Sequence, residues 1–311
     1  MRPTLRQLQY LVAVAESGRF RDAAKQVHIT QPGLSSQIAA MEDVLGATLF
    51  ERTATGAILT PRGTEVYRRA KCILRDVEEL KAFTRHEAAK LDGHFRLGVL
   101  PVVGPYLLPM AVRQLHTTYP NLRFSVREET AGKLDIHLNE GTFDTIISSQ
   151  HDHPGLAYEP LFDEHLWICV AADDPLALNR EPIGLEAIRG RHLLTLSGEF
   201  RLTAMVQSLS DEAGGIVSHE YEGTSLDSVR LMAEMGAGIA VLPSLYALSE
   251  VRRDPQMVIR RIDHPLAIHS VGLMWRETSP FAPSLQVLAD ELRQVALSLM
   301  ALPSDLLEST S

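Results

Sequence analysis

Two short segments near the N-terminus repeat apolar residues with the period of an α-helix, and only a very short break separates them. The first is 20–27. In the second, apolar residues recur at steps of four, three and four, at Leu34, Ile38, Met41 and Leu45. Its opposite face carries small and amide side chains, which suit base edges and phosphates in a major groove: Gln31, Ser35, Ser36 and Gln37. This is the layout of a helix-turn-helix motif.

The flanking segments complete a winged helix-turn-helix domain over residues 1–60. Apolar residues with helical spacing predict a first helix over 4–17, which Gly18 ends. Residues 47–59 predict a β-hairpin wing with Gly56 at its turn. Thr60 and Pro61 are typical of an N-cap and a first helical position, and predict that a long helix begins there.

The long helix is predicted over residues 61–90. It carries a heptad-like seam between charged flanks, at Val66, Ala70, Ile73, Val77, Leu80 and Thr84. Such a seam favours a linker helix that forms a dimer. The alternative is a helix that packs on its own domain.

Leu91-Asp92-Gly93 breaks this helix, and an effector-type body is predicted over 91–311. Strands are predicted at 95–100, 122–128, 144–148, 165–172, 193–196, 239–242, 258–261 and 270–275. Helices are predicted at 105–119, 133–139, 203–212, 225–235 and 284–299. The alternation predicts an α/β body.

Charge and composition fit a DNA-binding head on an acidic body. The net charge is −9, but residues 1–90 hold 14 Lys+Arg against 10 Asp+Glu, and the remainder holds 16 against 29. No apolar run is long enough to span a membrane, and no signal peptide is visible at the start. The two cysteines lie in different segments, so no disulfide framework is expected. We expect a cytoplasmic protein.

The N-terminal signature resembles that of LysR-type transcriptional regulators. It consists of Ala23-Ala24, Thr30-Gln31-Pro32, Leu34-Ser35, Gln37-Ile38, Leu45-Gly46, Leu49-Phe50-Glu51-Arg52, Leu59-Thr60 and Gly63. The resemblance implies a two-lobed, periplasmic-binding-protein-like α/β effector domain, with lobe I at about 93–163 and 268–311 and lobe II at about 164–267. It also implies a homodimer formed through the linker helix, a homotetramer, double-stranded operator DNA and RNA polymerase as partners, and a small-molecule effector between the lobes.

Within that family the body resembles the peroxide-sensing OxyR branch. The matching segments are 98–101, 104–109, 160–164, 224–226 and 236–243. That branch senses with two cysteines in the segment equivalent to 198–209, which here reads GEFRLTAMVQSL and contains none. Phe200 and Leu209 occupy the expected positions, and a thiolate is required for attack on peroxide. The resemblance therefore implies an OxyR-like regulator with a different input.

Candidate site residues follow from the motif and from the family plan. For DNA binding they are Thr30, Gln31, Pro32, Ser35, Ser36, Gln37 and Arg52, with Arg19, Arg21 and Lys25 as candidate backbone contacts. For the effector, residues at strand ends between the lobes are the candidates. They are Val102, Val103, Thr130, Ser148, Ser149, Ser197, Gly198, Glu199, Phe200 and Thr224.

The remaining candidates for chemistry point away from catalysis. Cys169 is expected to be a buried core thiol and Cys72 an ordinary helix residue, while His151 and His153 are expected on a surface loop rather than in a metal site. No nucleophile, phosphate-binding or metalloprotease motif is present, so no enzyme and no cofactor are expected. Two alternatives stay open: a regulator that is ligand-independent or responds to redox at Cys72 or Cys169, and a two-lobed solute-binding protein or enzyme.

Overall fold

The structure is a computed structural model, and it describes residues 3–53, 56–83, 91–179, 181–198, 200–218 and 225–301. The chain divides into two compact units, Met1–Glu87 with Asn139–Thr142, and Ala88–Leu138 with Phe143–Ser311. None of the helices in the described ranges is both long and apolar enough to cross a membrane.

The N-terminal unit is a winged helix-turn-helix. Its elements are α1 (Leu5–Ser17), α2 (Phe20–Gln26), α3 (Gln31–Leu45), β1 (Phe50–Thr53), β2 (Gly56–Leu59) and α4 (Pro61–Phe83). Helix boundaries follow local chemistry. Thr4 and Gln7 form a capping box on α1, and Gly18 ends that helix with a φ of 66°. The three predicted helices of the motif and the hairpin are confirmed, and the long helix is confirmed as far as Phe83.

The short turn between α2 and α3 contains His28, whose φ of 56° lies in the left-handed region. Thr30 then caps α3, its hydroxyl accepting the Gly33 N–H at 3.3 Å. Leu34, Ile38 and Met41 of α3 are buried in the core of this unit. The apolar spacing read from the sequence therefore fixes which face of α3 points outward.

The wing is held to the helices by backbone contacts. The Ala57 N–H donates to the Gly18 carbonyl at 2.8 Å, and one carboxylate oxygen of Glu42 accepts the N–H groups of Leu49 and Phe50 at 2.6 and 3.2 Å. Gly56 pairs with Thr53 as the first residue of β2, so it is a strand residue rather than the expected turn residue. A β-carbon there would lie 2.3 Å from the Gly18 oxygen.

Helix α4 has two environments along its length. Ala70 is buried and Val66 and Leu74 pack against the core of the N-terminal unit, whereas Ile73 and Leu80 are 44% and 64% exposed. The first half of the predicted seam thus packs on its own domain, which was the alternative interpretation. Of the later seam positions, Ile73 and Leu80 are exposed and Val77 is half-buried, and residues 84–90, including Thr84, lie outside the described residues.

The C-terminal unit is an α/β body. Lobe I contains β3 (Gly93–Val99), α5 (Gly104–Thr118), β4 (Leu122–Glu128), α6 (Ala131–Asn139), β5 (Thr145–Ser149), the first part of β6 (Ala157–Val170), β11 (Ile268–Trp275) and α10 (Ala282–Met300). Lobe II contains the rest of β6, β7 (His192–Leu194), α7 (Arg201–Ala213), β8 (Ile216–Val217), α8 (Leu226–Glu234), β9 (Ile239–Pro243), α9 (Ser244–Arg253) and β10 (Val258–Arg261). Short 3-10 turns lie at η1 (Gln150–Asp152), η2 (Pro175–Ala177), η3 (Leu185–Ile188) and η4 (Pro265–Ala267).

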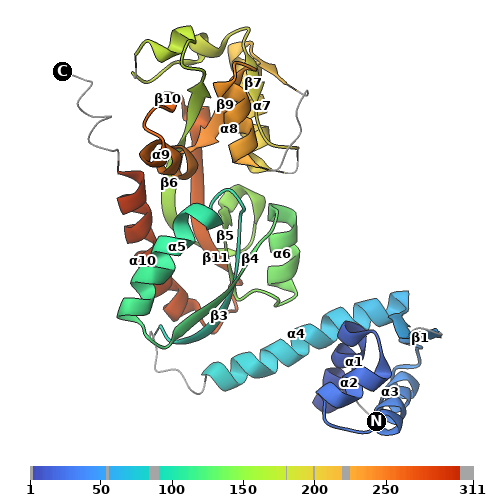
Figure 1. Ribbon diagram of the computed structural model, residues 1–311. Coiled ribbons are helices and arrows are strands. Elements are labelled where there is room, and N and C mark those ends of the chain that lie inside the picture. The colour runs from blue at the N-terminus through green and yellow to red at the C-terminus, as the bar shows by residue number, and fades with distance from the viewer. Residues whose placement is uncertain are drawn as a thin grey trace. The chain divides into compact units, whose positions relative to one another are not determined.

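The strands follow the order β4-β3-β5-β11-β6-β9-β7-β8, with β10 also pairing β6. In lobe I, β3 is parallel to β4 and β5, and β11 is antiparallel to β5 and β6. In lobe II, β7 is parallel to β8 and β9, while β6 is antiparallel to β9 and β10. Helices α5 and α10 lie on one side of lobe I and α6 on the other (Figure 1).

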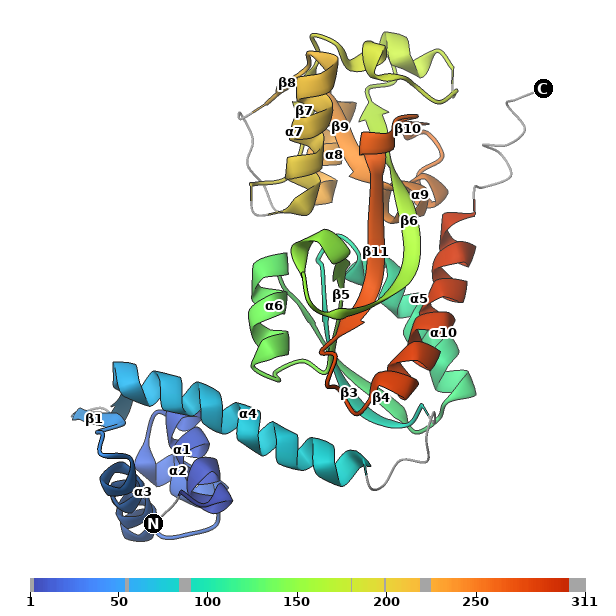
Figure 2. The same cartoon turned by 180° about the vertical axis from the view of Figure 1, so that it is seen from behind.

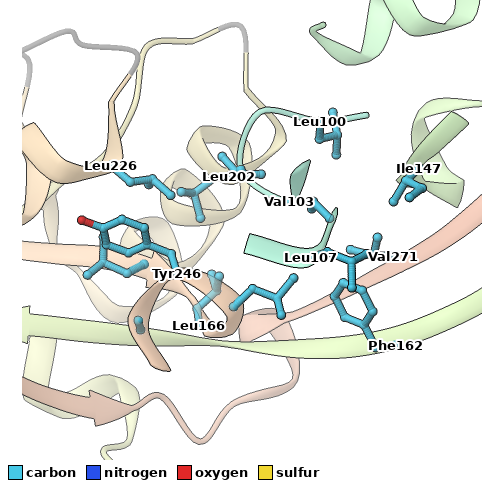
Figure 3. Close-up of a cluster of buried hydrophobic side chains, with 14 of the residues drawn as sticks. Leu100, Val103, Leu107, Ile147, Phe162, Leu166, Leu202, Leu226, Tyr246 and Val271 are labelled. Carbon is cyan, nitrogen blue, oxygen red and sulfur yellow. The ribbon is translucent and has the colours of Figure 1, made fainter. Parts of the chain in front are cut away.

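Strand β6 joins the two lobes. Its residues 157–165 pair with β11, and from Leu166 onward it pairs with β9 and β10 instead. Figure 2 shows β6 and β11 running side by side out of lobe I toward lobe II. Apolar side chains form one buried cluster across this junction, from Ile147 and Val271 in lobe I to Tyr246 and Leu226 in lobe II (Figure 3).

Besides the short 3-10 turns, three elements of the body differ from the sequence prediction. Strand β6 begins at Ala157 rather than at residue 165, the two-residue strand β8 was not predicted, and α9 follows β9 directly although no helix was predicted there. Pro160 and the acidic residues interrupt the pattern that is typical of a strand, so the first part of β6 was not predicted from the sequence. Proline is tolerated there because this part of the strand pairs on one side only, with β11. Helix α9 was not predicted because no loop marks its start: β9 ends at Pro243, and the helix begins at the next residue, Ser244.

Candidate functional site

The leading edge of α3 presents a polar surface. Thr30, Gln31, Pro32, Ser36 and Gln37 are exposed. Ser35 is half-buried, and Arg52 lies in β1, paired with Ala57, with its side chain outside the described residues. The structure therefore brings the predicted residues of α3 onto one exposed helix end. Amides and hydroxyls at such an end match the donor and acceptor groups of base edges.

Gln7 of α1 contacts the polar surface of α3, and this contact was not predicted from the sequence. Its Nε2 donates to Oε1 of Gln37 at 3.3 Å. This contact fixes the Gln37 amide so that its own N–H₂ group remains available as a donor. The only sequence signal was an amide three residues after the Thr4 N-cap, which the capping box fully explains.

The basic candidates lie on α2, the first helix of the motif, or directly before it, and none of them lies on α3. Arg19 precedes α2 as its N-cap residue, and Arg21 and Lys25 lie on α2. All three are exposed, and none forms an ion pair with another described residue. Cations free of carboxylate partners suit contacts to phosphates.

In the C-terminal unit, a small cavity lies between the lobes. It is lined by Leu100, Val102, Thr130, Ala131, Leu166, Phe200, Arg201, Leu202, Met205, Pro243 and His269. Its volume is about 10 Å³, which is room for about one water molecule. Effector pockets for drug-sized ligands are on the order of 300 Å³ or more. The cavity as it stands has no room for a ligand of that size.

The candidate effector residues divide into three groups. Val102, Thr130 and Phe200 line the cavity. The cavity wall does not include Val103, Ser148, Ser149, Ser197 or Gly198. Glu199 and Thr224 lie outside the described residues. Val103 precedes α5 and is fully buried in the core, which explains its place behind the wall.

Ser148 belongs to a buried polar chain instead. Its hydroxyl lies 2.9 Å from His153 Nε2, and His153 Nδ1 lies 3.4 Å from Asp135 Oδ1. His153 is buried, so the expectation of a surface position for it is wrong, whereas His151 is exposed. The described residues hold no group of three potential metal ligands.

Two ionic contacts that sequence reasoning missed lie at the cavity. Arg201, the first residue of α7, pairs across the lobes with Asp152 of η1, with Nη1 3.6 Å from Oδ1. His269 of β11 pairs with Glu164 of β6, with Nδ1 3.0 Å from Oε1, and Glu164 has no exposed surface. The sequence offered no signal for either contact, because the partners are 49 and 105 residues apart.

The two cysteines differ in environment. Cys169 is fully buried in β6, as predicted, and burial raises the pKa of its thiol to about 12. Cys72 lies half-buried on α4, and both are free thiols. A buried thiol with a raised pKa is unreactive at neutral pH.

Comparison with known proteins agrees with both halves of this geometry. Residues 5–64 match the bacterial regulatory helix-turn-helix protein, lysR family, and residues 88–297 match the LysR substrate binding domain. The chain is 34% identical over 290 residues to the DNA-binding transcriptional dual regulator OxyR of Escherichia coli K12, covering 93% of this chain and 94% of that protein.

Solved structures give the same result over the full length. A full-length OxyR variant from Pseudomonas aeruginosa superposes with a TM-score of 0.75 at 28% identity, covering 94% of this chain and 98% of that one. Full-length CbnR in complex with its target DNA matches with a TM-score of 0.53 at 25% identity, covering 94% and 99%. A DNA-reading helix end, an α/β body with a cavity between its lobes, and these matches lead to one conclusion: the chain belongs to the LysR family of DNA-binding transcriptional regulators with a C-terminal effector-binding domain, a family of regulators and not of enzymes.

Proposed function

We propose that α3 enters the major groove of an operator and that Gln31, Ser36 and Gln37 contact base edges. The supporting observation is the exposed polar end of α3, with Gln37 oriented by Gln7 at 3.3 Å. Thr30, Pro32 and Ser35 complete this end of the helix. Arg52 in the wing and the cations Arg19, Arg21 and Lys25 contact phosphates or the minor groove.

The functional parts of the chain are a DNA-binding domain at 1–60, a linker and dimerisation helix at 61–90 and an effector domain at 91–311. Lobe I comprises about 93–163 and 268–311, and lobe II about 164–267. The change of β6 partners at Leu166 and the start of β11 at Ile268 support these lobe limits. An effector binds between the lobes and changes their separation, which biases DNA binding through its different affinity for the two arrangements.

The protein acts as a homodimer through the later part of α4, and two dimers form a homotetramer. Ile73 and Leu80 support this assignment, because both are exposed apolar residues on one helix. The bound regulator contacts RNA polymerase at promoters, and its place is the cytoplasm, where the chromosome is.

A genome-wide footprint of the bound protein, repeated with Gln31→Ala/Ser36→Ala, tests the DNA-reading role. The wild type should protect discrete sites that share one sequence, and the double variant should lose that preference. An unchanged footprint in the variant contradicts the assignment of α3. The genes beside the protected sites then indicate which metabolites to try as effectors.

A redox-responsive regulator is the second candidate, and the environment of Cys169 counts against it. A fully buried thiol with a pKa of about 12 is a poor reductant. Reporter induction that persists in Cys72→Ser/Cys169→Ser would eliminate the redox role, and induction lost in that variant would support it.

A further inference from the structure

The wall of the inter-lobe cavity is apolar except at Thr130, Arg201 and His269. Nε of Arg201 and Nε2 of His269 are both buried without a hydrogen-bond partner. Unpaired buried donors are costly and rare in native proteins. The described residues hold seven buried side-chain atoms without a partner. These two nitrogens differ from the others because both belong to residues that line one cavity, where a bound molecule is able to complete their hydrogen bonds.

The environment of His269 determines what that molecule is. His269 is 6% exposed, and its Nδ1 faces the fully buried Glu164 carboxylate, whose other oxygen accepts the Leu245 N–H at 3.3 Å. A buried carboxylate requires a charged partner. Glu164 occupies the Nδ1 side of the ring, so Nε2 is the nitrogen left to the cavity, and it has no partner within the chain.

Arg201 adds positive charge on the same wall. It is the first residue of the thirteen-residue helix α7, whose N-cap, Phe200, provides no side-chain hydrogen bond. The partial positive charge at that helix end favours an anion. Asp152, across the lobes, is 3.6 Å from Nη1 of Arg201, longer than a hydrogen bond, and its Oδ2 is itself buried without a partner.

We propose that the effector is a small monocarboxylate with an apolar body. Its carboxylate accepts hydrogen bonds from Arg201 and His269, and its body packs against Leu100, Val102 and Leu202. This assignment rests on the proposed function of the cavity as the effector site and adds the chemical class of the ligand.

The same geometry connects binding with lobe movement. A ligand carboxylate competes with Asp152 for Arg201, and the cavity of about 10 Å³ is too small for a carboxylate with a carbon chain. Binding therefore requires the lobes to separate, and it removes the Arg201–Asp152 attraction that holds them together. Ligand occupancy and lobe separation are thereby linked.

Three compounds of equal length and different charge test the proposal: butyrate, butyramide and butylamine. Each is titrated against the full-length protein, with binding followed by calorimetry and by the shift in Tm. Butyrate should bind and raise Tm, and the other two should not. A response to butylamine or butyramide equal to or greater than that to butyrate overturns the proposal, as does the absence of binding by all three.

Variants locate the site. Arg201→Gln and His269→Gln should each weaken butyrate binding by about tenfold or more, whereas Asp152→Asn should strengthen it because the competing carboxylate is removed. Arg191→Gln is the matched control: Arg191 pairs with Asp174 within lobe II and lines no part of the cavity, so its affinity should stay at the wild-type value. Wild-type affinity in Arg201→Gln and His269→Gln contradicts the proposal.

The variant Ala131→Phe distinguishes two ways in which the proposal can fail: the ligand class is wrong, or the site is wrong. Ala131 lines the cavity, so the added ring should abolish butyrate binding. If a neutral or cationic compound binds and Ala131→Phe abolishes that binding, the cavity remains the effector site and only the carboxylate class is wrong. If butyrate binds Ala131→Phe as it binds the wild type, the effector site lies elsewhere and the proposed function of the cavity fails too.

Discussion

Gly63 of α4 lies directly against the carbonyl group of Leu49, and a β-carbon at position 63 would stand 2.0 Å from that oxygen. The oxygen also accepts the Thr60 N–H at 2.9 Å, so it cannot withdraw without breaking the start of α4. We expect Gly63→Ala to destabilise the N-terminal unit by about 3 kcal/mol or more. Thermal unfolding together with operator binding measures the loss.

Gly132 supplies the control for that substitution. It lies in α6, and a β-carbon there would meet nothing within 4 Å. Gly132→Ala should leave stability unchanged or raise it by about 0.4–1 kcal/mol, because alanine has less backbone freedom to lose on folding. Equal Tm values for Gly63→Ala and the wild type would show that the contact with Leu49 is not restrictive.

Glu42 attaches the wing to α3, since its carboxylate accepts two backbone N–H groups. Glu42→Ala leaves those donors without their partner, and we expect a loss of about 1.5–3 kcal/mol in the free energy of unfolding. Chemical denaturation of the two variants Glu42→Ala and Asp43→Ala measures it. Asp43 is the exposed neighbour, so a loss of similar size in Asp43→Ala would refute the role given to Glu42.

Arg21 and Gln31 should differ in how they affect DNA binding. Arg21→Gln removes a candidate phosphate contact, so the slope of log affinity against log salt concentration should decrease in magnitude by about 1, with sequence preference kept. Gln31→Ala should keep the slope and reduce the preference for the operator over other DNA. Fluorescence titrations at several salt concentrations distinguish the two outcomes, and identical behaviour of both variants would contradict the division of roles.

Burial raises the pKa of the Cys169 thiol from 9.0 to about 12, so folding favours its protonated form. Below about pH 9 this contribution to stability is fully present. As the pH rises from there toward 12, the unfolded chain loses the proton first, and the contribution declines by about 1.4 kcal/mol per pH unit. Denaturation at about pH 8 and about pH 10 should therefore show the wild type losing more stability than Cys169→Ala. Equal losses of stability in the wild type and in Cys169→Ala would mean that folding does not raise the pKa of this thiol.

The exposed apolar residues of α4 predict the effect of a charge at the dimer seam. Leu80 is 64% exposed, so Leu80→Glu should leave the folded monomer intact. In a coiled-coil seam the same change buries a carboxylate, and the dimer should dissociate. Sedimentation at several protein concentrations tests this, with Leu5→Glu, an exposed leucine on α1, as the control. A dimer of wild-type strength in Leu80→Glu would place the interface elsewhere.

Local patterns predicted most elements because the signals that specify them are local. The Thr30 N-cap, the apolar face of α3 and the Thr60-Pro61 start of α4 all act within a few residues, and each was found where the sequence placed it. The first part of β6 could not be found in this way. It is a strand because β11, more than one hundred residues later, pairs with it.

The cavity between the lobes was predictable in position and only partly in composition. Strand ends gave Val102 and Thr130, but the ionic groups at the cavity depend on pairs that topology brings together, such as His269 with Glu164 on adjacent strands. A single sequence gives no sign of such pairs. The polar end of α3 was predicted more completely, because its residues lie within eight positions of one another.

The division of α4 into a packed half and an exposed half has a consequence for how the regulator responds to its own abundance. Ala70 already packs the helix against the core of the N-terminal unit, so that unit folds without help from a second copy. In the proposed dimer, the exposed residues Ile73 and Leu80 determine only whether two such units act together. The occupied fraction of a two-part operator should then rise more than linearly with the number of copies of the protein in the cell. Dilution at cell division should therefore weaken repression or activation before any effector is sensed.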